Sequence, residues 1–145
     1  MNNIELHVQE KEDFCLCSVL QAIFKKNGII LSQEEISTYL TPGKERGFIA
    51  DDKKIKEFLC SKGFEYFCFW KDETPFNEPD ELLKKMSKYN GIAGIKNHVY
   101  LVNNFNSSKV NLINPQDGKE IEIEYLTLLK EMEGTGFFGL VKHID

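Results

Sequence analysis

Apolar residues recur at helical spacing in the first third of the chain. Between Asp13 and Gly28 they fall every three or four positions, at Leu16, Val19, Leu20, Ile23 and Phe24. This spacing predicts a largely buried helix, with Asp13 as its N-cap and Gly28 as its C-terminal stop.

Two further helices are expected before residue 64. Ser32 followed by Glu35 is a capping-box pattern that opens a short helix. The apolar residues of this helix share one side: Ile36, Tyr39 and Leu40. The third helix is expected from Asp52 to Lys62, and Gly63 ends it because glycine readily adopts the left-handed conformation of a helix C-terminus.

The pattern changes at Phe64, where short runs of β-branched and aromatic residues begin, separated by Gly, Asn, Ser or Pro. Such runs are typical of strands joined by turns. The expected strands cover residues 64–70, 92–95, 98–102, 110–113, 121–123 and 137–141. Two helices interrupt them, one from Pro79 to Gly91 and a short one from Tyr125 to Met132.

Helices followed by an antiparallel sheet indicate the α+β class. We expect a single domain over residues 1–145, with a helical half (1–63) packed on a mainly sheet half (64–145). A cleft is expected where the first helix meets the sheet, because pockets favour such junctions.

Composition narrows the function classes. The chain has 145 residues, 18 Lys+Arg against 23 Asp+Glu, a net charge of −5 and 41% hydrophobic residues. This composition argues against disorder and against a membrane span, and the lack of a basic stripe argues against nucleic acid as a partner. The acidic N-terminus is unlike a secretory signal, so a cytoplasmic location is expected.

The four cysteines, Cys15, Cys17, Cys60 and Cys68, would stay reduced in a cytosol and leave a thiol available for chemistry. The alternative is that all four are small buried apolar residues. Cys15 and Cys17 lack the spacing of a zinc knuckle and no second knuckle follows, so we expect neither a metal site nor a cofactor.

A cysteine nucleophile needs a base, a group that orients the base, and donors for an oxyanion. Cys15 lies in the first turn of the expected helix, where the helix dipole favours thiolate, whereas Cys17 lies about 200° further around it. If strands 98–102 and 109–113 form a hairpin, His98 lies beside Asn114. Alternatively, His98 is a solvated edge residue and Asn114 opens a turn.

Gln9, six residues before Cys15, adds a side-chain amide donor. With this spacing, and with Gly28 thirteen residues after Cys15, the chain resembles the papain-like cysteine peptidase domains that precede bacteriocin ABC transporters and cleave leader peptides after a double glycine. The runs that begin at His98 and end at Asn114-Pro115 are similar to the later signature of that family. The resemblance implies a papain-like fold, Cys15 as nucleophile, His98 as base and Gln9 as oxyanion donor.

This chain departs from that family at two places. It reads Phe14-Cys15-Leu16 where the family has Asp-Cys-Gly, and Asn114 stands where the family usually has Asp. We expect the bulk of Leu16 to narrow the approach to the thiol. A stand-alone peptidase domain is expected, because the sequence shows no apolar span and no phosphate-binding glycine loop.

The expected function is hydrolysis of a peptide bond in a leader peptide, or in another peptide or protein substrate, through Cys15, His98 and Asn114. An acyltransferase on the same fold and a catalytically weak or inactive peptide-binding module remain alternatives. A separate transporter or biosynthetic protein is the partner that the resemblance suggests.

Overall fold

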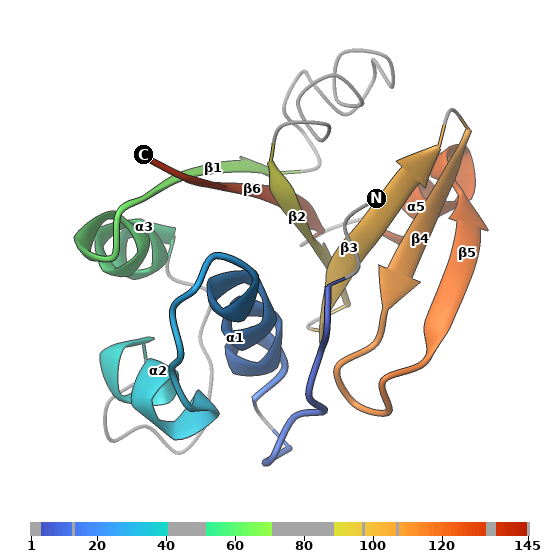
Figure 1. Cartoon of the computed structure of the whole chain (residues 1–145). Coiled ribbons are helices and arrows are strands. Elements are labelled where there is room, and N and C mark those ends of the chain that lie inside the picture. The colour runs from blue at the N-terminus through green and yellow to red at the C-terminus, as the bar shows by residue number, and fades with distance from the viewer. Residues whose placement is uncertain are drawn as a thin grey trace.

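The computed structural model describes residues 4–12, 14–40, 52–70, 89–96, 98–106, 108–132 and 136–144. Among the described residues, three helices come first, followed by strands and one further helix (Figure 1). The helices are α1 (Cys15–Lys26), α2 (Gln33–Leu40), α3 (Asp52–Ser61) and α5 (Tyr125–Glu131). The strands are β1 (Phe64–Trp70), β2 (Asn90–Ile95), β3 (His98–Asn106), β4 (Lys109–Ile113), β5 (Glu120–Glu124) and β6 (Phe137–His143). The expected α+β class is confirmed.

The strands form one six-stranded sheet in the order β1-β6-β2-β3-β4-β5, with antiparallel neighbours. Strand β6 lies between β1 and β2, so these two strands, the first two of the described sheet in chain order, are joined through it. The hairpin of β3 and β4 pairs Leu101 with Ile113. This register brings the beginning of β3 and the end of β4 to the same edge of the sheet, as the sequence predicts.

Helix α1 begins at Cys15, and Phe14, at the N-cap position, makes no side-chain cap hydrogen bond among the described residues. The predicted cap, Asp13, lies outside the described residues. At the other end, Gly28 has φ +83°, a conformation that costs little only for glycine. The predicted stop at Gly28 is confirmed, and Gly63 ends α3 in the same way with φ +85°.

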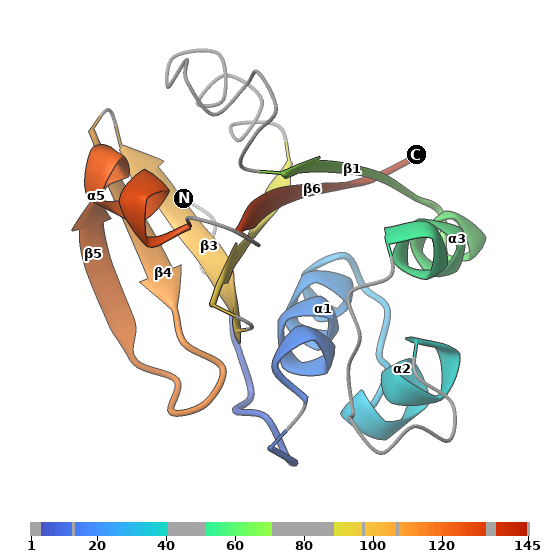
Figure 2. The same cartoon turned by 180° about the vertical axis from the view of Figure 1, so that it is seen from behind.

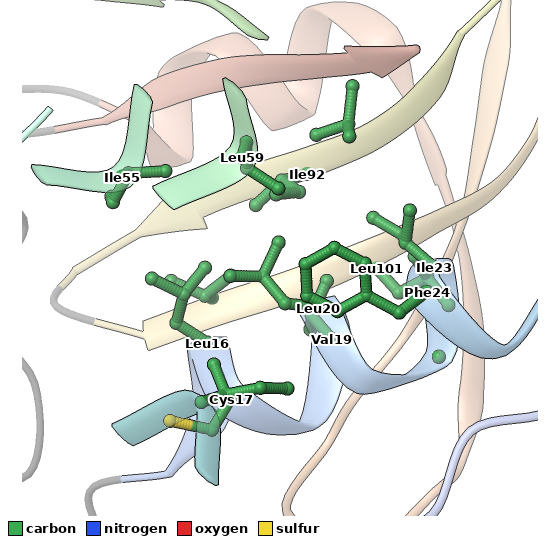
Figure 3. Packing of buried hydrophobic residues seen from close by; sticks show 14 of the residues in the cluster. Leu16, Cys17, Val19, Leu20, Ile23, Phe24, Ile55, Leu59, Ile92 and Leu101 are labelled. Carbon is green, nitrogen blue, oxygen red and sulfur yellow. The ribbon is translucent and has the colours of Figure 1, made fainter. Parts of the chain in front are cut away.

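The buried residues form two clusters. The larger one lies between the sheet and helices α1, α2 and α3, and Figure 3 shows part of it, including Leu20, Phe24, Leu59 and Ile92. The smaller cluster packs α5 against the sheet and contains Tyr125, Leu128 and Phe138. Figure 2 shows α5 beside β3, β4 and β5, away from the other helices. Every apolar residue of α1 is buried and belongs to the larger cluster, so the burial of this helix contributes strongly to the folding free energy.

Some sequence expectations differ from the structure. Tyr39, expected on the buried side of α2, is 55% exposed and stacks on the ring of Phe58. Strand β3 continues beyond Val102 to Asn106, past an irregularity in its pairing with β4. The hairpin turn is therefore shorter than expected, because polar asparagines join the ladder instead of forming a loop.

The helix expected from Pro79 to Gly91 lies mostly outside the described residues, and its last part, from Asn90, belongs to β2. Within the described part of the chain, no helix is long and apolar enough to cross a bilayer.

Candidate active site

His98 and Asn114 meet at one edge of the sheet. His98 is the first residue of β3, and Asn114 follows the last residue of β4. His98 Nε2 lies 2.7 Å from Asn114 Oδ1. The predicted proximity of these two side chains is confirmed, and the antiparallel hairpin is its cause.

The hydrogen bonds of Asn114 fix the orientation of both side chains. The backbone N–H of Gln116 donates to Asn114 Oδ1 at 2.9 Å. An atom that accepts from a backbone N–H must be the amide oxygen, so His98 Nε2 must carry the proton that it donates to the same atom. In the neutral imidazole, Nδ1 is then the basic nitrogen.

Tyr100 packs against the imidazole from the same strand. The rings of His98 and Tyr100 are edge to face, with centroids 4.8 Å apart. Burial, followed by the charges of Asp117, Cys15 and Glu131, raises the pKa of Tyr100.

Cys15 is the first residue of α1 and is 5% exposed. It belongs to the same buried cluster as Val99, the residue after His98, and Ile113, the residue before Asn114. The first turn of α1 carries no acidic side chain, so no negative charge there opposes the helix dipole, which favours an anion at this end.

Cys17 has a different environment. It is 1% exposed, and burial, followed by the charges of Cys15 and Glu34, raises its pKa to about 12. Figure 3 places Cys17 and Leu16 among the core residues of α1. Leu16 is 1% exposed, so the expectation that it narrows the approach to Cys15 is wrong: its side chain fills the core instead.

Gln9 lies in the segment of residues 7–10, which we call the N-terminal segment. Its backbone N–H donates to the carbonyl of Pro115 at 2.7 Å. Its side-chain Nε2 donates to the carbonyls of Lys11 at 3.0 Å and Glu12 at 2.6 Å, while Oε1 is buried and has no hydrogen-bond partner among the described residues. In this structure both amide hydrogens of Gln9 therefore close the turn before α1.

Sequence reasoning missed Gln33, a wholly buried polar residue at the start of α2. Its side chain bonds to Glu10, Val8 and Gln21. The sequence gives little indication that Gln33 is buried, because this residue lies between the capping-box residues Ser32 and Glu35, where a polar side chain is usually solvated.

The described residues contain no group of three or more His, Cys, Asp or Glu side chains placed to hold a metal ion.

Known structures share this architecture. One is a double-glycine motif protease from an AMS/PCAT transporter, solved with the leader peptide (TM-score 0.72, 14% identity, 97% of this chain and 92% of that chain). The chain has the papain-like peptidase fold. A second is the peptidase domain of Streptococcus ComA, a bifunctional ABC transporter of a quorum-sensing pathway (TM-score 0.68, 22% identity, 95% of this chain and 98% of that chain).

The likeness spans nearly the whole chain, and the resemblance to double-glycine peptidase domains is confirmed for the fold. In comparisons of sequence, no family model and no curated protein matches this chain.

Proposed function

We propose that this protein is a cysteine peptidase that hydrolyses a peptide bond, with Cys15 as nucleophile, His98 as general base and acid, and Asn114 as the residue that orients His98. The backbone N–H of Cys15 and the side-chain amide of Gln9 are the proposed oxyanion donors. The proposed substrate is a peptide with small residues before the scissile bond, by analogy with the double-glycine proteases that share the fold.

The proposed reaction has two halves. His98 Nδ1 takes the proton of the Cys15 thiol, and the sulfur attacks the carbonyl carbon of the substrate. As the C–N bond breaks, the imidazolium returns a proton to the leaving amine, which leaves a thioester on Cys15. Water then attacks the thioester with His98 as base, and the carboxylic acid product and free thiol are released.

One observation carries this proposal: the hydrogen bond between His98 Nε2 and Asn114 Oδ1, at an oxygen already fixed by Gln116 N–H. A solvated edge histidine has no need of such an arrangement. The bond holds the tautomer that leaves Nδ1 available to a thiol, the arrangement that a Cys–His pair needs.

A second candidate, a peptide-binding module with weak turnover, is favoured by Gln9. Its amide hydrogens lie on the carbonyls of Lys11 and Glu12. To hold an oxyanion, Gln9 must exchange at least one of these bonds for the substrate oxygen. If no such exchange occurs, only the backbone donor remains and the transition state is poorly stabilised.

The test is cleavage of a synthetic peptide with Gly-Gly before a fluorogenic amine. Cys15→Ala is expected to abolish release of the amine, because no other group forms the thioester. Cys17→Ala, a change two residues further along α1, is the matched control and is expected to retain cleavage, because Cys17 is buried with a pKa of about 12.

Selective labelling separates the candidates without a known substrate. Iodoacetamide at pH 6, followed by peptide mapping, compares Cys15 with Cys60, an exposed thiol in the same molecule. A Cys–His pair should label Cys15 faster than Cys60; slower labelling would favour the binding module. An added amine nucleophile would reveal acyl transfer by forming a new amide product.

A further inference from the structure

Gln33 holds the N-terminal segment from both sides of Gln9. Its Oε1 accepts the backbone N–H of Glu10 at 2.9 Å, and its Nε2 donates to the carbonyl of Val8 at 3.0 Å. A glutamine amide carries a donor and an acceptor together, so this one side chain satisfies both kinds of backbone group. The bonds fix the peptide on each side of the proposed oxyanion donor.

The same amide ties the segment to α1. Gln33 Nε2 also donates to Gln21 Oε1 at 3.0 Å, and Ser18 Oγ donates to the carbonyl of His7 at 2.5 Å. Ser18 and Gln33 are both wholly buried. Buried hydrogen bonds of this kind define geometry strongly, because breaking one leaves a desolvated polar group.

The other side of the segment faces the sheet. The N–H of Gln9 donates to the carbonyl of Pro115 at 2.7 Å, and Pro115 directly follows Asn114. The N-terminal segment therefore connects the helix that begins with Cys15 to the turn that carries Asn114. In Figure 1 it runs between α1 and the hairpin of β3 and β4.

We infer that Gln33 is a positioning residue of the site: by fixing the N-terminal segment on α1 and α2, it sets how Cys15 lies relative to His98 and Asn114, and where Gln9 lies relative to both. This inference rests on the proposed function. Small displacements matter here, because a shift of about 1 Å in reacting groups can cost about a hundredfold in rate.

The experiment compares wild type with Gln33→Met, which keeps the length of the side chain and removes its polar atoms. Two quantities are measured. The first is hydrogen exchange at the backbone N–H of Gln9, which donates to the carbonyl of Pro115. The second is the rate at which iodoacetamide labels Cys15 relative to Cys60 at pH 6. We expect exchange to quicken and the labelling ratio to fall, each by about tenfold.

Ile36→Val is the matched control, because Ile36 is wholly buried on the same helix and has no part in the polar network. It should lower the melting temperature without changing the labelling ratio or the exchange at Gln9. A fall in the labelling ratio for Gln33→Met but not Ile36→Val separates positioning from general loss of stability. With the Gly-Gly peptide as substrate, Gln33→Met should lower kcat by a larger factor than it changes KM.

If Gln33→Met does not fold, Ser18→Ala tests the same inference through the bond to His7, with a smaller fall in labelling, about threefold. A folded Gln33→Met with wild-type exchange at Gln9 overturns the inference, whatever the activity. So does a Ser18→Ala protein with unchanged exchange and labelling. Failure of the proposed function has another signature: wild-type Cys15 would label no faster than Cys60, and the positioning role would fall with it.

Discussion

The thiol side and the imidazole side of the candidate site are built differently. His98 and Asn114 are sixteen residues apart and are brought together by one hairpin. The placement of Cys15 depends on the helices and on the N-terminal segment, and buried side-chain amides from residues far apart in the sequence join these elements. The imidazole side is therefore a local structure, whereas the placement of the thiol side depends on long-range polar contacts.

Among variants that keep the Cys15 nucleophile, the largest effect is expected on the thiol side, from Gln9→Ala. If Gln9 holds the oxyanion, its removal should lower kcat about a hundredfold to a thousandfold. The hydrogen bonds of Gln9 to Lys11 and Glu12 also disappear, so a modest loss of stability, about 1 kcal/mol, should accompany it. Peptide cleavage and urea unfolding measure the two effects separately.

A Gln9→Ala protein that loses stability but keeps its kcat would show that Gln9 only closes the turn before α1. In that case the thiol side would contribute a nucleophile without a side-chain oxyanion donor.

On the imidazole side, Asn114→Ala should lower kcat by about a hundredfold, because an unoriented imidazole loses part of its general acid–base contribution. Asn103→Ala is the control: Asn103 bonds to Asn111 across the same hairpin, away from His98. Equal losses from the two substitutions would mean that the hairpin, and not the bond to His98, is what matters.

The free energy of unfolding at alkaline pH should distinguish the larger buried cluster from the smaller one under α5. Burial raises the pKa of Cys17, in the larger cluster, from 9.0 to about 12 and that of Tyr125, under α5, from 10.0 to about 12. Both groups are held neutral in the folded state, so the unfolded state loses protons first. Stability is therefore full below the unfolded pKa and falls as pH rises, by about 1.4 kcal/mol per pH unit for each group.

Urea unfolding between pH 8 and pH 11 measures this dependence. The loss should begin near pH 9 through Cys17 and steepen above pH 10 through Tyr125. Cys17→Ala should remove the early part and Tyr125→Phe the later part; a wild-type profile that stays flat to pH 11 would contradict both assignments.

The sequence was most informative where a single local rule decides the outcome. The spacing of Leu16, Leu20 and Phe24 defines α1, and Gly28 ends it because of its positive φ. The hairpin register follows from two short strands and a turn, which is why the meeting of His98 and Asn114 could be predicted. Tyr39 was misplaced because one edge of a short helix carries both core and surface residues, and periodicity alone does not resolve them.

The parts that the sequence did not reveal depend on tertiary contacts. In the sequence, nothing distinguishes Gln33, Gln21 and Ser18 from solvated polar residues. Their role depends on the N-terminal segment packing beside them. The orientation of the Gln9 amide also depends on the turn at Lys11 and Glu12, which no residue pattern identified. Sequence spacing predicted which residues belong to the site but not what holds them in place.

The position of β6 has a consequence for how the protein acquires this structure. In the described sheet β1 pairs with β6 alone, and β2 needs β6 on one side. During synthesis β1 and β2 leave the ribosome long before β6 is made. The aromatic strand Phe64–Trp70 therefore has no partner strand for its backbone hydrogen bonds, whereas the hairpin of β3 and β4 can already form. During synthesis the chain should be most prone to aggregation in that interval, and a nascent chain arrested before residue 137 should remain sensitive to protease within β1.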